Sequence, residues 1–122
     1  MRSKYHMQKI IFSLFLFFLA SCSNEQPIQS GSYVFKHKYA EHPGLESITF
    51  DVEIDGLKVT VTNNNQEGTW PKGVVEEGRL FLHSSNKWLI VHNKSDEQAE
   101  EVGGCTDGPT VIDLEKKIYW TC

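Results

Sequence analysis

The stretch ITFDVEIDGLKVTVTN, residues 48–63, decides the fold of this chain. Apolar and polar residues alternate on both sides of Asp55-Gly56, which is the period of a half-buried β-strand. Asp-Gly is a preferred pair for a two-residue type I′ turn. We therefore predict a hairpin in which Ile54 pairs with Leu57. The apolar side chains of this hairpin would share one face: Phe50, Val52, Ile54, Leu57, Val59 and Val61.

Similar patterns on both sides extend the prediction to a whole domain. Residues 31–39 alternate as an opening strand, with the aromatic side chains at every second position. Residues 79–92 and 110–122 predict two more hairpins. The last of them would gather its apolar side chains on one side: Ile112, Leu114, Ile118 and Trp120. The result is an all-β fold, a small antiparallel barrel or a sandwich of about seven strands.

One short helix is predicted between the last two hairpins. Ser95, with Gln98 three residues later, resembles a capping box, and acidic residues suit the positive first turn of a helix. We expect the helix to span residues 96–102 and to end at Gly103-Gly104.

The first 21 residues have the composition of a secretory signal. Arg2, Lys4 and Lys9 give a positive start, and an apolar run follows from residue 10 to residue 20. Its eleven residues would reach about 16 Å as a helix, roughly half of the hydrocarbon core of a bilayer. A cleaved signal is therefore favoured over a membrane-spanning helix.

The end of this run, Leu19-Ala20-Ser21-Cys22, resembles the lipobox of bacterial lipoproteins. The resemblance implies cleavage before Cys22, a diacylglycerol on its sulfur and an acyl chain on its freed amine. Such a lipid anchor attaches a protein durably to the membrane, outside the cytoplasm. Ser23 stands where an aspartate would favour inner-membrane retention in that family, so the outer membrane is expected in a Gram-negative host. The alternative is ordinary cleavage near Ala20, which would leave Cys22 as a plain thiol.

Acylation of Cys22 would leave Cys105 and Cys122 as one disulfide pair in an oxidising compartment. In the chain-entropy model this crosslink is worth on the order of 3 kcal/mol. The chain then divides into three parts. These are a signal peptide (residues 1–21), a lipidated cysteine with a flexible tether (22–32), and a single all-β domain (33–122).

The net charge of the chain restricts the kinds of molecule that it can bind. Without residues 1–21, the chain keeps sixteen acidic and nine basic residues, a formal net charge of −7. The lysines are scattered, and no basic stripe is present, which argues against nucleic acid as a partner.

The hairpin of residues 79–92 is apolar on both faces, so its second face needs a cover. That face carries Phe81, Leu89 and Val91. The cover could be the predicted helix, the tether or the far wall of a barrel. Alternatively, these three side chains could form a docking patch for a protein partner or an apolar ligand.

No catalytic or metal-binding pattern stands out. A cysteine nucleophile would need a free thiolate, and lipid plus disulfide would consume all three cysteines. His37 and His42, with Glu41, could form a loop metal site, but hydrogen-bonded or exposed histidines are the favoured interpretation. The acidic residues of the predicted helix lack the spacing of a calcium loop and favour a solvated face. We expect no cofactor, no metal and no enzymatic activity.

Two local similarities point to binding proteins with β-domains. Gly68-Thr69-Trp70 resembles the Gly-x-Trp motif of lipocalins, although that family has it on the first strand and here it falls mid-chain. Ser30-Gly31-Ser32-Tyr33 is similar to a loop of periplasmic lysozyme inhibitors, one residue short. The leading hypothesis is a non-catalytic interaction or inhibitor-type domain of the cell envelope, with a protein partner there. The alternative is a lipocalin-like carrier of a small apolar ligand. A filled core would favour the first and an open apolar cavity the second.

Overall fold

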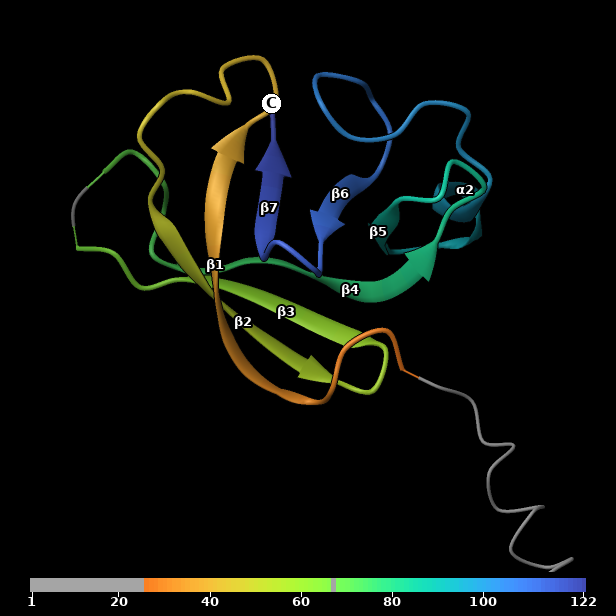
Figure 1. Ribbon diagram of the computed structural model, residues 1–122, viewed down its shortest axis with the longest axis horizontal. Coiled ribbons are helices and arrows are strands. Elements are labelled where there is room, and N and C mark those ends of the chain that lie inside the picture. Colours follow the sequence, from red (N-terminus) through yellow and green to blue (C-terminus); the bar gives the residue numbers. More distant parts are fainter. Residues whose placement is uncertain (1–25, 67) are drawn as a thin grey trace, which may run out of the picture.

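The computed structural model describes residues 26–66 and 68–122, which form a closed barrel of seven strands (Figure 1). This confirms the all-β fold and decides for a barrel over a sandwich. The strands follow one another around the barrel in sequence order. Their bounds are Gly31–Tyr39 (β1), Thr49–Asp55 (β2), Lys58–Asn63 (β3), Gly73–Leu82 (β4), Trp88–Val91 (β5), Thr110–Asp113 (β6) and Ile118–Thr121 (β7).

Six of the seven strand pairings are antiparallel, but β1 and β7 pair in parallel. In Figure 1 these two strands lie side by side with their arrows pointing the same way. Antiparallel pairing along an odd number of strands leaves the first and last running in the same direction. A seven-stranded meander can therefore close only through a parallel seam, and the barrel is mixed where the sequence analysis predicted an antiparallel one.

The first hairpin forms with its turn shifted by one residue. Asp55 pairs with Lys58 and Ile54 with Val59, where the prediction paired Ile54 with Leu57. Gly56 has a φ of +63° and Leu57 does not have a positive φ, which is the φ pattern of a type II′ turn with glycine first. Leu57 therefore lies in the turn, 42% exposed. The partner of Ile54 thus moves by two residues, from Leu57 to Val59, and a shift of two residues leaves the inward and outward positions of each strand unchanged.

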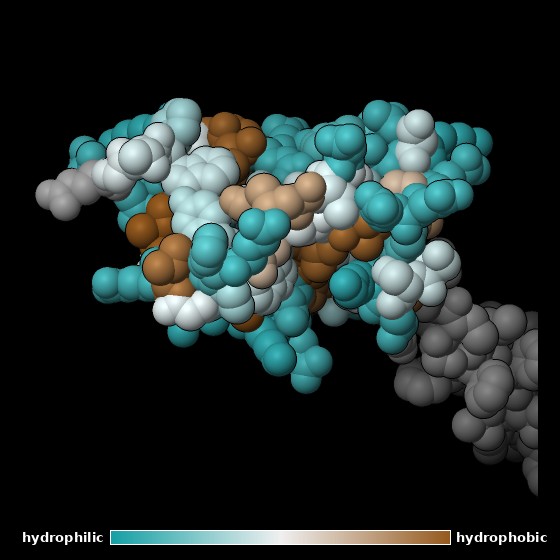
Figure 2. Space-filling view, turned by 90° about the horizontal axis from the view of Figure 1, so that it is seen from above, coloured by the Kyte–Doolittle hydropathy of each residue, from teal (hydrophilic) through white to brown (hydrophobic). Residues whose placement is uncertain are grey.

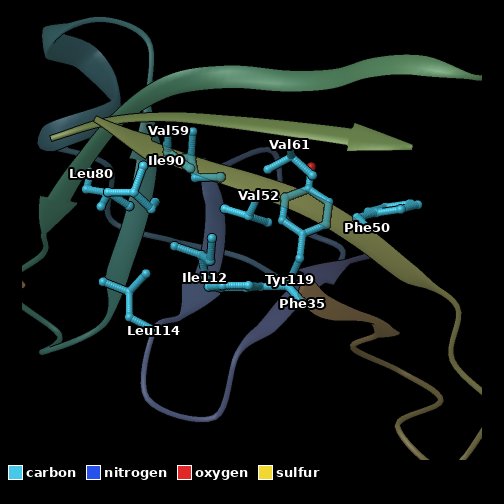
Figure 3. Close-up of a cluster of buried hydrophobic side chains, with 11 residues drawn as sticks. Phe35, Phe50, Val52, Val59, Val61, Leu80, Ile90, Ile112, Leu114 and Tyr119 are labelled. Atoms are coloured by element: carbon cyan, nitrogen blue, oxygen red, sulfur yellow. The ribbon is translucent and has the colours of Figure 1, made fainter. Parts of the chain in front are cut away.

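Side chains from all around the barrel fill its interior (Figure 3). The buried cluster consists of Phe35, Phe50, Val52, Ile54, Val59, Val61, Leu80, Ile90, Ile112, Leu114 and Tyr119. A barrel of about eight strands is just wide enough for side chains to fill. The seven-stranded barrel is filled in this way.

Strand β7 turns the opposite face to the core from the one predicted, whereas Ile112 and Leu114 lie in the core as predicted. Tyr119 pairs with Ile112 and joins the core cluster, while Ile118 is buried outside that cluster and Trp120 is half-buried. The prediction assumed a three-residue turn, whereas Asp113 pairs with Ile118 across four residues. A change of one residue in register turns the side chains of a strand to the opposite face.

The tether ends earlier than predicted, because residues 26–32 lie against the barrel. Ile28 packs against the core, and the Ser30 hydroxyl accepts a hydrogen bond of 2.9 Å from the Gly56 amide. Gly31 and Ser32 already belong to β1. Cys22 and the rest of residues 22–25 lie outside the described residues.

The helix and the disulfide are both present, the helix with different bounds. It spans Lys94–Glu97 (α2), starting and ending earlier than predicted. Its N-cap is Asn93, whose side-chain oxygen accepts a bond of 3.0 Å from the Asp96 amide, so Ser95 is not the cap. Cys105 and Cys122 form the predicted disulfide, with Cα atoms 4.6 Å apart. It ties the end of β7 to the segment that precedes β6.

Strand β4 reaches further toward the N-terminus than the predicted hairpin and has a register irregularity opposite Val61 and Thr62. Gly78, within this extension, lies very close to β5. A Cβ on Gly78 would stand 2.7 Å from the Val91 carbonyl oxygen and 2.8 Å from the Ile90 Cγ2 atom. The close approach of these two strands therefore requires glycine at position 78.

We expect Gly78→Ala to lower the free energy of unfolding by about 1–3 kcal/mol, because the added methyl group overpacks this contact. Gly44→Ala is the matched control: its Cβ would meet nothing within 4 Å, and the change should stay within about 0.5 kcal/mol. Urea denaturation of both variants measures the difference. Equal stabilities would contradict the close approach of β4 and β5.

Candidate functional site

The proposed docking patch on the second hairpin is not an exposed surface. Leu89 and Val91 are buried, with exposed fractions of 0% and 2%, and Phe81 is half-buried. Part of the segment of residues 92–109 lies next to this hairpin: the Ala99 carbonyl meets His83, and Gly103 approaches Val111, the cross-strand partner of Leu89. Because Leu89 and Val91 are buried, these residues do not form an exposed docking patch.

A hydrogen bond of His83 joins the segment of residues 92–109 to the turn between β4 and β5. Its Nε2 atom lies 2.7 Å from the carbonyl oxygen of Ala99, which can only accept, so Nε2 carries the proton. Nδ1 then accepts a bond of 3.1 Å from the Ser85 amide. A buried histidine whose two nitrogens are both used in this way holds the chain in place, which accounts for its burial.

The end of the barrel where the described chain enters β1 is here called the entry end. A groove runs along β6 and β7 from Pro27 at this end to Ala40, which follows β1 at the opposite end. Strands β5 and β6 pair only through Leu89 with Val111 and Ile90 with Thr110, and they separate beyond these pairs toward the entry end. The groove has a volume of about 1020 Å³. Its apolar lining includes Pro27, Leu82, Trp88, Val111, Leu114 and Trp120.

The groove combines aromatic and aliphatic walls with a charged rim. Leu82 is 47% exposed and pairs across the strands with half-buried Trp88. Lys87, Asp113 and Glu115 also line it. Figure 2 looks instead at the opposite end of the barrel, where β1 and β7 finish, and shows hydrophobic surface interspersed with hydrophilic side chains there. An apolar groove with a few polar groups is the form that small-molecule and peptide sites share.

A second cluster lies inside the opposite, far end of the barrel, around the carboxylate of Glu76. Tyr119 donates a hydrogen bond of 2.7 Å to one carboxylate oxygen, and Thr110 donates one of 3.3 Å to the other. Burial and the neighbouring Glu76 carboxylate both raise the pKa of Tyr119. Tyr119 therefore remains a neutral donor, which suits a structural bond better than acid–base chemistry.

His92 joins this cluster to the start of α2. Its Nε2 atom lies 3.2 Å from a Glu76 carboxylate oxygen, and its Nδ1 atom lies 3.5 Å from one of Asp96. When the imidazole is protonated, both contacts are ion pairs. Within residues 26–66 and 68–122, no three side chains are grouped so that they could hold a metal ion.

The structure agrees with a hydrogen-bonded histidine at position 37 rather than with the alternative of a loop metal site, because His37 points into the core. It is 2% exposed, its Nε2 atom lies 2.7 Å from the Thr121 hydroxyl, and its ring stacks on Phe50 at 5.0 Å. Trp70, from the lipocalin-like motif, packs edge-on against His37 and donates a bond of 3.2 Å to the Tyr39 hydroxyl. These aromatic residues belong to the filled interior.

Comparisons with protein-family models, with curated proteins and with solved structures find no match to this chain. In the part of the chain that the structure describes, no helix is long and apolar enough to cross a membrane. Cys22, the predicted lipid attachment site, lies outside the described residues.

Neither the groove nor the Glu76 cluster could be predicted from the sequence pattern. Leu82 and Trp88 pair with each other and alternate with Phe81 and Leu89, but nothing in the alternation shows where a barrel opens. Glu76 falls in the part of β4 that has no clear alternation. In the sequence, Glu76 is a charged residue directly after two valines, and nothing in the pattern links it to His92 or Tyr119.

His37 gives the stability of the domain a dependence on pH. Burial lowers the pKa of His37 below its ordinary value of 6.5, so just below that pH the unfolded chain binds a proton that the folded chain resists. We expect the wild-type protein to lose stability, relative to His37→Gln, as the pH falls from 7 through this range. His42→Gln, at an exposed position, is the control. Parallel stability curves for wild type and His37→Gln would contradict the burial of a neutral imidazole.

Proposed function

We propose that this protein is a bacterial lipoprotein, anchored outside the cytoplasm through acylated Cys22. The support is the lipobox-like sequence after a short apolar run, together with the cysteine count. The observed disulfide between Cys105 and Cys122 agrees with that count, because it leaves one cysteine for the lipid. In a Gram-negative host we place the protein at the outer membrane.

The barrel acts in this proposal as a non-catalytic interaction domain. The observation that carries it is the filled interior, since a carrier of the lipocalin type needs an open apolar cavity for its ligand. A partner would then bind on the outer surface or in the groove that opens at the entry end, which is concave and partly apolar. The Glu76 cluster supports the same conclusion, because hydrogen bonds within the protein already engage its carboxylate.

Acylation is tested by mass spectrometry of the protein purified from a bacterial membrane. We expect a wild-type amino-terminal peptide that begins at Cys22 and carries acyl mass. Cys22→Ala should lose this peptide, because its sulfur is the attachment atom. The double variant Cys105→Ala/Cys122→Ala should keep it, since the disulfide plays no part in processing. An unmodified wild-type peptide that begins near Ser21 would contradict the proposal.

A further inference from the structure

We propose that the entry end of the barrel, with the opening of the groove beside Leu82 and Trp88, faces the phospholipid surface of the membrane that holds the anchor. Leu82 and Trp88 then lie at the level of the lipid headgroups. This inference rests on the proposed acylation of Cys22. It names the partner of the groove and gives the domain a fixed orientation, with the far end pointing away from the bilayer.

The length of the tether brings the groove to the membrane. Pro27 lines the groove, and it is only the fifth residue after Cys22. A fully extended chain of that length reaches at most about 18 Å. Because residues 26–32 lie against the barrel, the predicted tether of residues 22–32 cannot act as a long spacer. The entry end is therefore the part of the domain nearest to the lipid.

The side chains at this end suit a membrane interface. Leu82 is 47% exposed at the end of β4, beside half-buried Trp88. Tryptophan is enriched where hydrocarbon meets water, because its ring is apolar and its N–H can still reach polar groups. At the far end, by contrast, Trp70 is engaged with Tyr39 and His37.

The charges agree with this orientation. The turns and strand ends of the entry end carry four lysines and three carboxylates, a formal charge of +1, which becomes zero when Glu77, 3.0 Å from Lys58, is included. These residues are Lys58, Lys87, Lys116 and Lys117, with Asp55, Asp113 and Glu115. Since the chain from Cys22 onward carries −7, the rest of it carries −8, or −7 when Glu77 is counted with the entry end. An anionic membrane would repel that remainder and leave the entry end as the face that can approach.

The test uses the acylated full-length mature protein in vesicles of phosphatidylcholine and phosphatidylglycerol in equal amounts, with or without bromine on the acyl chains. Bromine quenches nearby tryptophan fluorescence. Trp120→Phe leaves Trp70 and Trp88, and Trp88→Phe/Trp120→Phe leaves Trp70 alone. We expect brominated lipid to cause a clear loss of emission in the first variant and little loss in the second. Both variants keep Trp70, which is half-buried against the core at the far end, and unbrominated vesicles give the reference emission.

A second pair of variants tests the face without removing a tryptophan. Leu82→Glu should reduce the quenching of Trp88, because a carboxylate at the rim is repelled by anionic lipid. Val74→Glu is the control: Val74 is 63% exposed on the same strand, toward the far end. Thermal unfolding of both variants confirms that they are folded.

Equal quenching in the two tryptophan variants, or no effect of Leu82→Glu, would overturn the inference and leave the groove to a protein partner or a small apolar ligand. These outcomes are separate from a failure of the proposed function. A protein without acyl mass, which does not remain with the vesicles, contradicts the anchor itself. A protein that is acylated and vesicle-bound, with Trp88 unquenched, contradicts only the orientation.

Discussion

The parallel seam between β1 and β7 is the contact on which the rest of the structure depends. It joins the two ends of the sheet through hydrogen bonds from the Lys36 amide to the Lys117 carbonyl, 2.9 Å, and from the Ala40 amide to the Thr121 carbonyl, 2.8 Å. Closure leaves no exposed sheet edge and places the inner face of every strand against the same core. The disulfide lies directly beyond β7, so it secures the strand that completes the barrel.

Closure around a filled core determines where this protein can interact. In the part of the chain that the structure describes, buried side chains fill the interior, and the two ends of the barrel differ in the side chains that they carry. The far end buries hydrogen-bonded polar groups around Glu76 and His37. The entry end exposes Leu82 and half-exposes Trp88 around a groove, close to the residue that we propose carries lipid. An anchored domain with two different ends is suited to be held in one orientation.

Local periodicity predicted the strands well, and contacts distant in sequence were harder to predict. The hairpin of residues 48–63 was found because its alternation is strict, and its inward face survived a one-residue error in the turn. At the turn before Ile118, four residues lie in the turn where three were predicted, so the register of β7 moved by a single residue. A shift of one residue turned the predicted inward face of β7 outward. The loop after α2, which lies next to Leu89 and its partner Val111, has no periodic pattern. A cover over this face could therefore be stated from the sequence only as an alternative. The acylation of Cys22 stays a prediction.

Hydrogen exchange at the seam tests the closed barrel most directly. The amides of Lys36 and Ala40 both donate across it. If the barrel is closed, these two amides exchange as slowly as those of β2 and β3, because they open only when the whole domain unfolds. If they exchange as fast as exposed loop amides while β2 and β3 stay protected, the sheet is open and the account is wrong.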